Sequence, residues 1–70
     1  MNAPIRYQFL IDGEVSDRVN ATSSGMKVAP TVGGYTSLSG PVADHIAMRS
    51  VMARIDLLGL TIAELRRLPD

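Results

Sequence analysis

The sequence contains no cysteine and no tryptophan, and it has one histidine among its 70 residues. Without cysteine there is no disulfide framework, no thiol nucleophile and no thiolate metal site. The single His45 cannot build a multi-histidine metal site by itself. We therefore expect neither a metal ion nor another cofactor.

The sequence also lacks an excess of charge of either sign and lacks long apolar runs. Seven lysine and arginine residues balance seven aspartate and glutamate residues. Nucleic-acid-binding proteins usually carry a basic surplus that neutralises phosphates, so this balance argues against a nucleic-acid partner. No apolar run approaches the roughly 18 residues of a membrane span, and residues 1–6 do not form a signal-peptide pattern. We expect a cytoplasmic protein that does not associate with membranes.

The short length limits how much core the chain can build. We interpret residues 1–70 as a single domain, with a core of aliphatic residues because only Tyr7, Phe9 and Tyr35 are aromatic. A domain of this size buries only about 60% of the surface that its unfolded chain exposes. A second subunit would add stability, so we expect a homodimer.

The first half of the sequence predicts a strand, a short helix and a hairpin. Apolar side chains alternate with polar ones over residues 5–12, which is typical of a strand with one buried face. Ser16 is a suitable helix cap, and Val15 and Val19 have helical spacing, so residues 16–21 are expected to form a short helix. Strands at 26–30 and 35–39 follow, joined by a turn containing Gly33 and Gly34.

The second half predicts a long amphipathic helix. Gly40-Pro41 is expected to end the preceding strand, and residues 43–58 then carry apolar side chains at helical spacing: Met48, Val51, Met52, Ile55 and Leu58. Asp44 would complement the positive end of the helix dipole. Gly59 would end the helix in the left-handed conformation, which lets Leu60 pack back on Ile55.

The segment at residues 60–67 fits two structures. As a strand it would form the final edge of the sheet, with Arg66 and Arg67 protecting that edge. As a helix it would begin with a capping box formed by Thr61 and Glu64, and the pattern alone slightly favours this alternative.

A resemblance favours the strand. The run Thr36-Ser37-Leu38-Ser39-Gly40-Pro41-Val42-Ala43-Asp44, followed by a helix and then Leu58-Gly59-Leu60, resembles a group of short actinobacterial proteins of unknown function. The opening residues 7–16 also resemble the first strand and turn of that group. The resemblance implies a strand at the tail and carries no function or side-chain role with it.

Together these elements predict an α+β fold. The order of strand, short helix, two strands, long helix and strand is that of a small ferredoxin-like sandwich, with a four-stranded antiparallel sheet covered on one face by the helices. Leu10, Leu38 and Leu65 are the candidates for the uncovered face. Sheet-to-sheet or edge-to-edge pairing of two copies would hide them.

Three functions are compatible with this sequence. The first is a non-catalytic module that binds another protein or a small ligand, because no catalytic constellation is present. The second is a helix-turn-helix nucleic-acid binder, since residues 57–67 also resemble the helical joint of mercury-resistance-type regulators. The third is a small ferredoxin-like enzyme in which His45 or Tyr35 acts in an apolar pocket. For His45 beside Asp44, a solvent-facing histidine in the first helical turn is the simpler interpretation.

Overall fold

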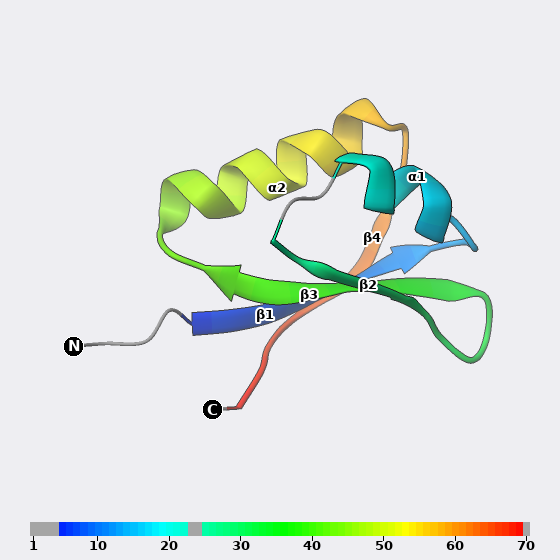
Figure 1. Ribbon diagram of the computed structural model, residues 1–70, viewed down its shortest axis with the longest axis horizontal. Helices are drawn as coiled ribbons and strands as arrows, with labels where there is room; N and C mark the ends of the chain where they lie inside the picture. Colours follow the sequence, from blue (N-terminus) through cyan, green and yellow to red (C-terminus); the bar gives the residue numbers. More distant parts are fainter. Residues whose placement is uncertain (1–4, 23–24, 70) are drawn as a thin grey trace.

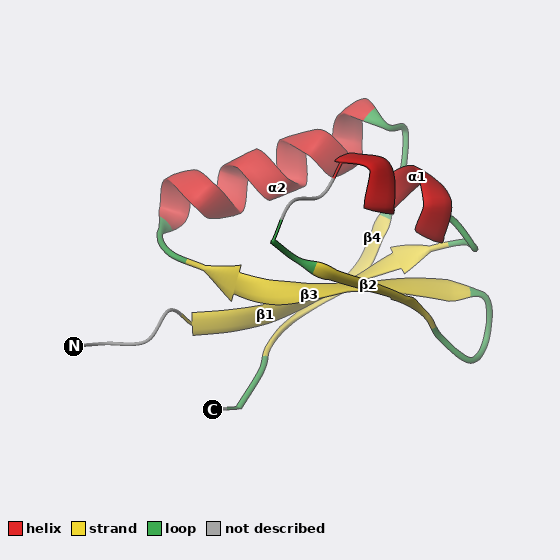
Figure 2. Ribbon diagram, in the orientation of Figure 1, coloured by secondary structure: helices red, strands yellow, loops and turns green. Residues whose placement is uncertain are grey.

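The protein folds into one sheet with both helices on the same side of it (Figure 1). The computed structural model describes residues 5–22 and 25–69, without the side chains of residues 20–22. The elements in chain order are β1 (Ile5–Asp12), α1 (Ser16–Thr22), β2 (Lys27–Pro30), β3 (Tyr35–Val42), α2 (His45–Leu57) and β4 (Ile62–Arg67). Figure 2 shows the two layers, with the strands below and the helices above. The fold is therefore α+β, as the order of elements predicts.

The sheet has the strand order β2-β3-β1-β4, and all three pairings are antiparallel. In the centre of the sheet, Phe9 of β1 lies opposite Leu38 of β3 and opposite Leu65 of β4. Directly opposed residues point to the same face, so this row faces the helices. The neighbouring row of Ser37, Leu10 and Glu64 points to the open face.

The core lies between the sheet and the helices and is aliphatic apart from Phe9. Six apolar residues are buried in one cluster: Phe9, Ile11, Val19, Leu38, Val42 and Ile55. They come from β1, α1, β3 and α2, and among the described side chains each helix contributes one to this cluster. The alternation of Phe9 and Ile11 in β1 predicted their burial.

Both ends of α2 are closed by specific hydrogen bonds. Asp44 is the N-cap, and its Oδ1 accepts a hydrogen bond of 2.9 Å from the amide of Ala47. At the other end Gly59 has φ of +73°, and the amides of Gly59 and Leu60 donate to the carbonyls of Asp56 and Ile55. This pair of bonds is the Schellman motif, and it turns Leu60 back toward the core.

Replacing the N-cap residue should weaken this helix measurably. We expect Asp44→Ala to lower the free energy of unfolding by about 1 kcal/mol, because the Ala47 amide loses its acceptor. Asp44→Ser, which keeps a capping oxygen, should lose much less. Urea denaturation of the three proteins measures the difference, and equal losses in both variants would show that the cap does not stabilise the helix.

The strand β3 runs through Gly40 and Pro41, so the prediction that this pair ends the strand at residue 39 is wrong. The Tyr35 carbonyl accepts from the Thr31 amide on the β2 side, and backbone groups alternate along a strand, so the nitrogen of Pro41 also points toward β2. The β2 pairing has already ended at Lys27 opposite Ser39. The nitrogen of Pro41 therefore faces no paired residue of β2, and the sheet loses no hydrogen bond because proline lacks an N–H.

The tail is a strand, as the resemblance implies, and the capping-box alternative is wrong. β4 pairs with β1 from Tyr7 opposite Arg67 to Ile11 opposite Ile62, with a register shift next to Leu10. Pairing with a central strand satisfies the backbone of this segment and overrides the local preference for a helical cap. The helix-turn-helix hypothesis, which needs a helix at residues 60–68, is contradicted.

Candidate functional site

A cavity of about 320 Å³ lies between the two helices, above β3. Its lining comes from both helices, from the two residues before β2, from β3 and from the residue after α2. The described residues that line it are Val19, Gly25, Met26, Leu38, Pro41, Ala47, Ser50, Val51, Arg54, Ile55 and Leu58.

The cavity has an apolar floor and a more polar rim. Val19, Leu38 and Ile55 are buried and form the floor. At the rim, Ser50 and Arg54 of α2 are exposed to solvent. Ligand sites combine predominantly apolar walls with a few polar groups that fix orientation, and this cavity has that composition.

The unequal lengths of the helices explain where the cavity lies. α1 has seven residues and α2 has 13, which correspond to lengths of about 10 Å and about 20 Å. Among the described side chains of this two-turn helix, Val19 is buried in the layer above the sheet. Met26 and side chains of α2 line the space beside Val19.

One hydrogen bond ties the two helical walls together. Arg18 of α1 donates from Nη2 to the carbonyl oxygen of Leu58, at 2.5 Å. Leu58 is the C-cap residue of α2, where a cation complements the negative end of the helix dipole. The contact fixes the end of α2 against α1 beside the cavity.

Arg54 is the charged side chain among the described residues of the cavity lining. In the described part of the chain its guanidinium has no ion-pair partner. Arg54 can present up to five N–H donors to an anionic group. A carboxylate held at the rim would therefore find an unused partner.

A second hollow beside the start of α1 does not have the same character. It is lined by Glu14, Val15, Ser16, Asp17, Arg18 and Pro30, none of which is buried. Within residues 5–22 and 25–69 there is also no group of three or more histidine, aspartate or glutamate residues placed to hold a metal ion. No helix in those ranges has the length and apolar character that crossing a membrane requires.

The three leucines predicted for the uncovered face do not share it. Leu10 does face the open side, half-buried between Ser37 and Glu64. Leu38 is 1% exposed and belongs to the core, and Leu65 lies opposite Phe9 on the helix side at the sheet edge. Placing Leu38 and Leu65 on the uncovered face was wrong, because both align with Phe9 in the register.

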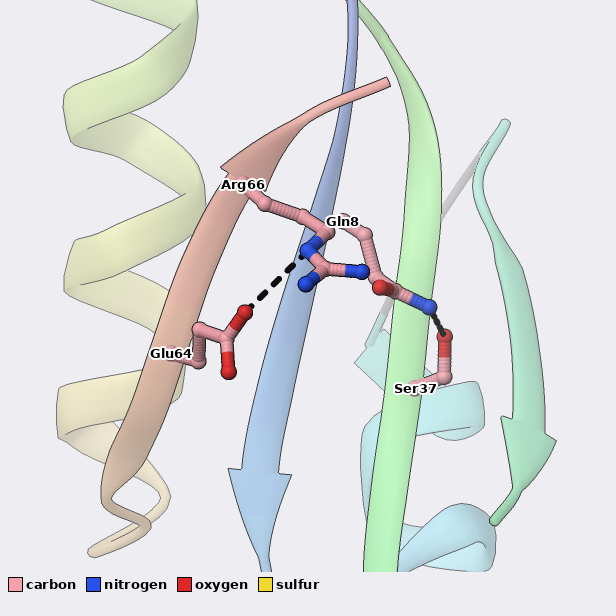
Figure 3. Close-up of polar contacts among 4 residues, drawn as sticks. All are labelled: Gln8, Ser37, Glu64 and Arg66. Atoms are coloured by element: carbon pink, nitrogen blue, oxygen red, sulfur yellow. Dashed lines mark hydrogen bonds and ion pairs between the residues drawn. The ribbon is translucent and has the colours of Figure 1, made fainter. Parts of the chain in front are cut away.

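The open face is consequently polar. Figure 3 shows Gln8, Ser37, Glu64 and Arg66 on it, with the Gln8 amide donating to the Ser37 hydroxyl at 3.0 Å and Arg66 paired to Glu64 at 3.1 Å. Such a face can remain in water without a covering subunit. Sheet-to-sheet pairing through apolar side chains is therefore not favoured by its composition.

The two residues considered for catalysis do not reach the cavity. Tyr35 lies opposite Asp12 on the open face, and His45 is exposed at the first position of α2; neither lines the cavity. The Asp44 carboxylate accepts from the Ala47 amide, so it acts as a helix cap. These positions contradict an enzyme in which His45 or Tyr35 acts in that cavity.

Comparisons with known proteins give a family without a described activity. No curated protein and no solved structure matches the chain. Residues 6–66 match one family and include nearly all of β1 and β4 and everything between them. The chain therefore belongs to the family described as a domain of unknown function, DUF8691.

Proposed function

We propose that the protein is a small-ligand-binding module whose site is the cavity between α1 and α2. The observation that carries the proposal is a buried apolar floor of Val19, Leu38 and Ile55 beneath an exposed arginine, Arg54, that has no ion-pair partner among the described residues. A volume of about 320 Å³ falls at the lower end of the range for ligand sites, about 300–1,000 Å³. The ligand is therefore small.

The chemistry of the lining indicates an amphipathic carboxylate as the ligand. An aliphatic or aromatic tail would gain free energy by leaving water for the apolar floor. The carboxylate would lie at the rim, where Arg54 supplies a positive charge and Ser50 a hydroxyl. Binding of this kind needs no catalytic residue.

The fold supports this proposal through its topology, which we propose is ferredoxin-like. β1 and β2 run in the same direction with β3 between them, and β3 and β4 do so with β1 between them. Each pair is joined by one helix, which gives the split βαβ arrangement twice. Both crossover helices then lie on one face, and the cavity between them is a product of that connection.

Titration with hexanoate tests the proposal. We expect saturable changes in the amide NMR signals of cavity residues, Leu38 and Val51 among them, with weaker binding by hexanol. Arg54→Gln should weaken hexanoate binding about two- to fivefold, the range for an exposed ion pair, and leave hexanol binding unchanged. Arg54→Lys, which keeps the charge, is the matched control.

A second variant tests the location of the site. Ser50→Trp places a large side chain at the rim without altering the buried core and should abolish binding, whereas Ser50→Ala should not. If each ligand binds Ser50→Trp as tightly as it binds the wild type, the cavity is not the site. The absence of any saturable signal change would contradict the proposed ligand class.

A further inference from the structure

The outer edge of β4 has unpaired backbone groups. The Leu68 amide donates to the Arg6 carbonyl at 2.8 Å, and Arg66 and Glu64 lie opposite Gln8 and Leu10. Backbone groups of successive residues point to alternate sides of an antiparallel strand. Those of Leu65 and Arg67 therefore point away from β1, at an edge of the sheet that no other strand within residues 5–22 and 25–69 covers. Such an edge can pair with another strand.

The charges along β4 are self-complementary about Leu65. If two copies of β4 pair in antiparallel fashion around a two-fold axis at Leu65, Glu64 of each copy lies opposite Arg66 of the other. Both side chains already point to the open face (Figure 3), and Glu64 is 51% exposed and Arg66 63%. Opposite charges at directly opposed positions stabilise a strand pair, whereas like charges destabilise it.

This complementarity selects one register. An axis at Glu64 would put two glutamates opposite each other, and an axis at Arg66 would do the same with two arginines. The axis at Leu65 avoids both clashes and places Arg67 opposite Ala63, a small side chain. Registers with the axis at Glu64 or at Arg66 would also keep the open faces of the two sheets on the same side. The charges of β4 therefore favour the Leu65 register over these two.

Apolar side chains on the helix side of the same edge would also be covered. Leu65 is 40% exposed, and the axis brings the two copies of it together. Met52 of α2, 41% exposed, lies about 160° around the helix from Arg54 and so on the flank away from the cavity. Because the cavity is bounded by Met26 and α1, the Met52 flank faces the β4 side of the sheet.

We propose that a second copy of this chain docks on the β4 edge, with Leu65 on the two-fold axis and two reciprocal Glu64–Arg66 pairs. The two four-stranded sheets then form one continuous sheet. This inference does not rest on the proposed ligand site, because the cavity lies on the opposite flank of α2.

Mixing two charge-reversed variants tests the register. Glu64→Arg gives a strand edge with two positive charges, and Arg66→Glu gives one with two negative charges. Alone, each should self-associate with a Kd about 10- to 100-fold weaker than wild type, because two attractive pairs become repulsive. Mixed in equal amounts, they should form a heterodimer at the same protein concentrations at which the wild type dimerises, since every opposed pair is again of opposite sign. Analytical ultracentrifugation, with a fluorescent label on one variant, measures both results.

Two further variants make the result unambiguous. Lys27→Glu changes charge by the same amount on the opposite edge strand, β2, and should not affect association. Leu65→Pro removes an outward-pointing amide, so it should abolish the dimer and leave the pairing of β4 with β1 intact by circular dichroism. A wild-type chain that stays monomeric to millimolar concentration overturns the proposal. A dimer that survives Leu65→Pro, or charge-reversed variants that do not associate when mixed, would overturn it equally.

Discussion

Thr36→Val is expected to lower the free energy of unfolding by about 2–4 kcal/mol, because it leaves two backbone groups without their partner. The Thr36 hydroxyl donates to the Gly13 carbonyl at 2.8 Å and accepts from the Val15 amide at 3.0 Å. Thr36 is completely buried, so water cannot replace the lost hydroxyl at that position. Valine has nearly the same shape, so the loss reports the hydrogen bonds rather than a cavity.

The effect should be concentrated in the turn between β1 and α1. Thr36 holds that turn against β3, and the turn carries α1 and its buried Val19 toward the sheet. Hydrogen exchange of the Val15 amide should therefore accelerate more than that of amides in α2. Thr36→Ser retains the hydroxyl and is the control in urea denaturation; a Thr36→Ser protein as unstable as Thr36→Val would contradict the role of the hydrogen bonds.

Phe9→Ala has the largest expected effect, a loss of about 3–5 kcal/mol. Phe9 is fully buried in the middle of β1 and lies opposite Leu38 on one side and Leu65 on the other. A 70-residue domain has a total stability of about 4–10 kcal/mol. The substitution therefore removes a large share of the total, and much of the protein should be unfolded near 37 °C.

Thermal denaturation followed by circular dichroism measures this loss. Arg6→Ala, in the same strand but exposed on the open face, should change stability by no more than about 0.5 kcal/mol and controls for general effects on β1. Phe9→Leu, which keeps a large apolar side chain, should lie between the two. If Phe9→Ala were as stable as Arg6→Ala, the core would not be centred on this row.

Regular patterns made parts of the fold predictable. The alternation over residues 5–12 identified β1 with its bounds, and the spacing of Val51 and Ile55 identified α2 to within two residues at its start and one at its end. Gly33 and Gly34 have φ of +95° and +84°, as the hairpin prediction requires. In each case the signal is local, because the residues concerned are close in sequence.

The parts that were missed depend on neighbours distant in sequence. Whether Pro41 ends a strand depends on where β2 stops, and whether residues 62–67 form a strand depends on β1 being available as a partner. The face of Leu38 was not evident because serines and threonine surround it in β3, which has no clear alternation. The cavity combines residues from most of the chain, and no single segment has a pattern that indicates it.

Measuring intermolecular NOEs between hexanoate and the protein methyl groups shows whether the space between α1 and α2 holds the apolar part of a small carboxylate. We expect NOEs from the alkyl chain to methyl groups of Val19, Leu38 and Ile55, which form the floor of the cavity. NOEs confined to side chains on the open face, such as Leu10, or to the exposed Leu57 would contradict this expectation.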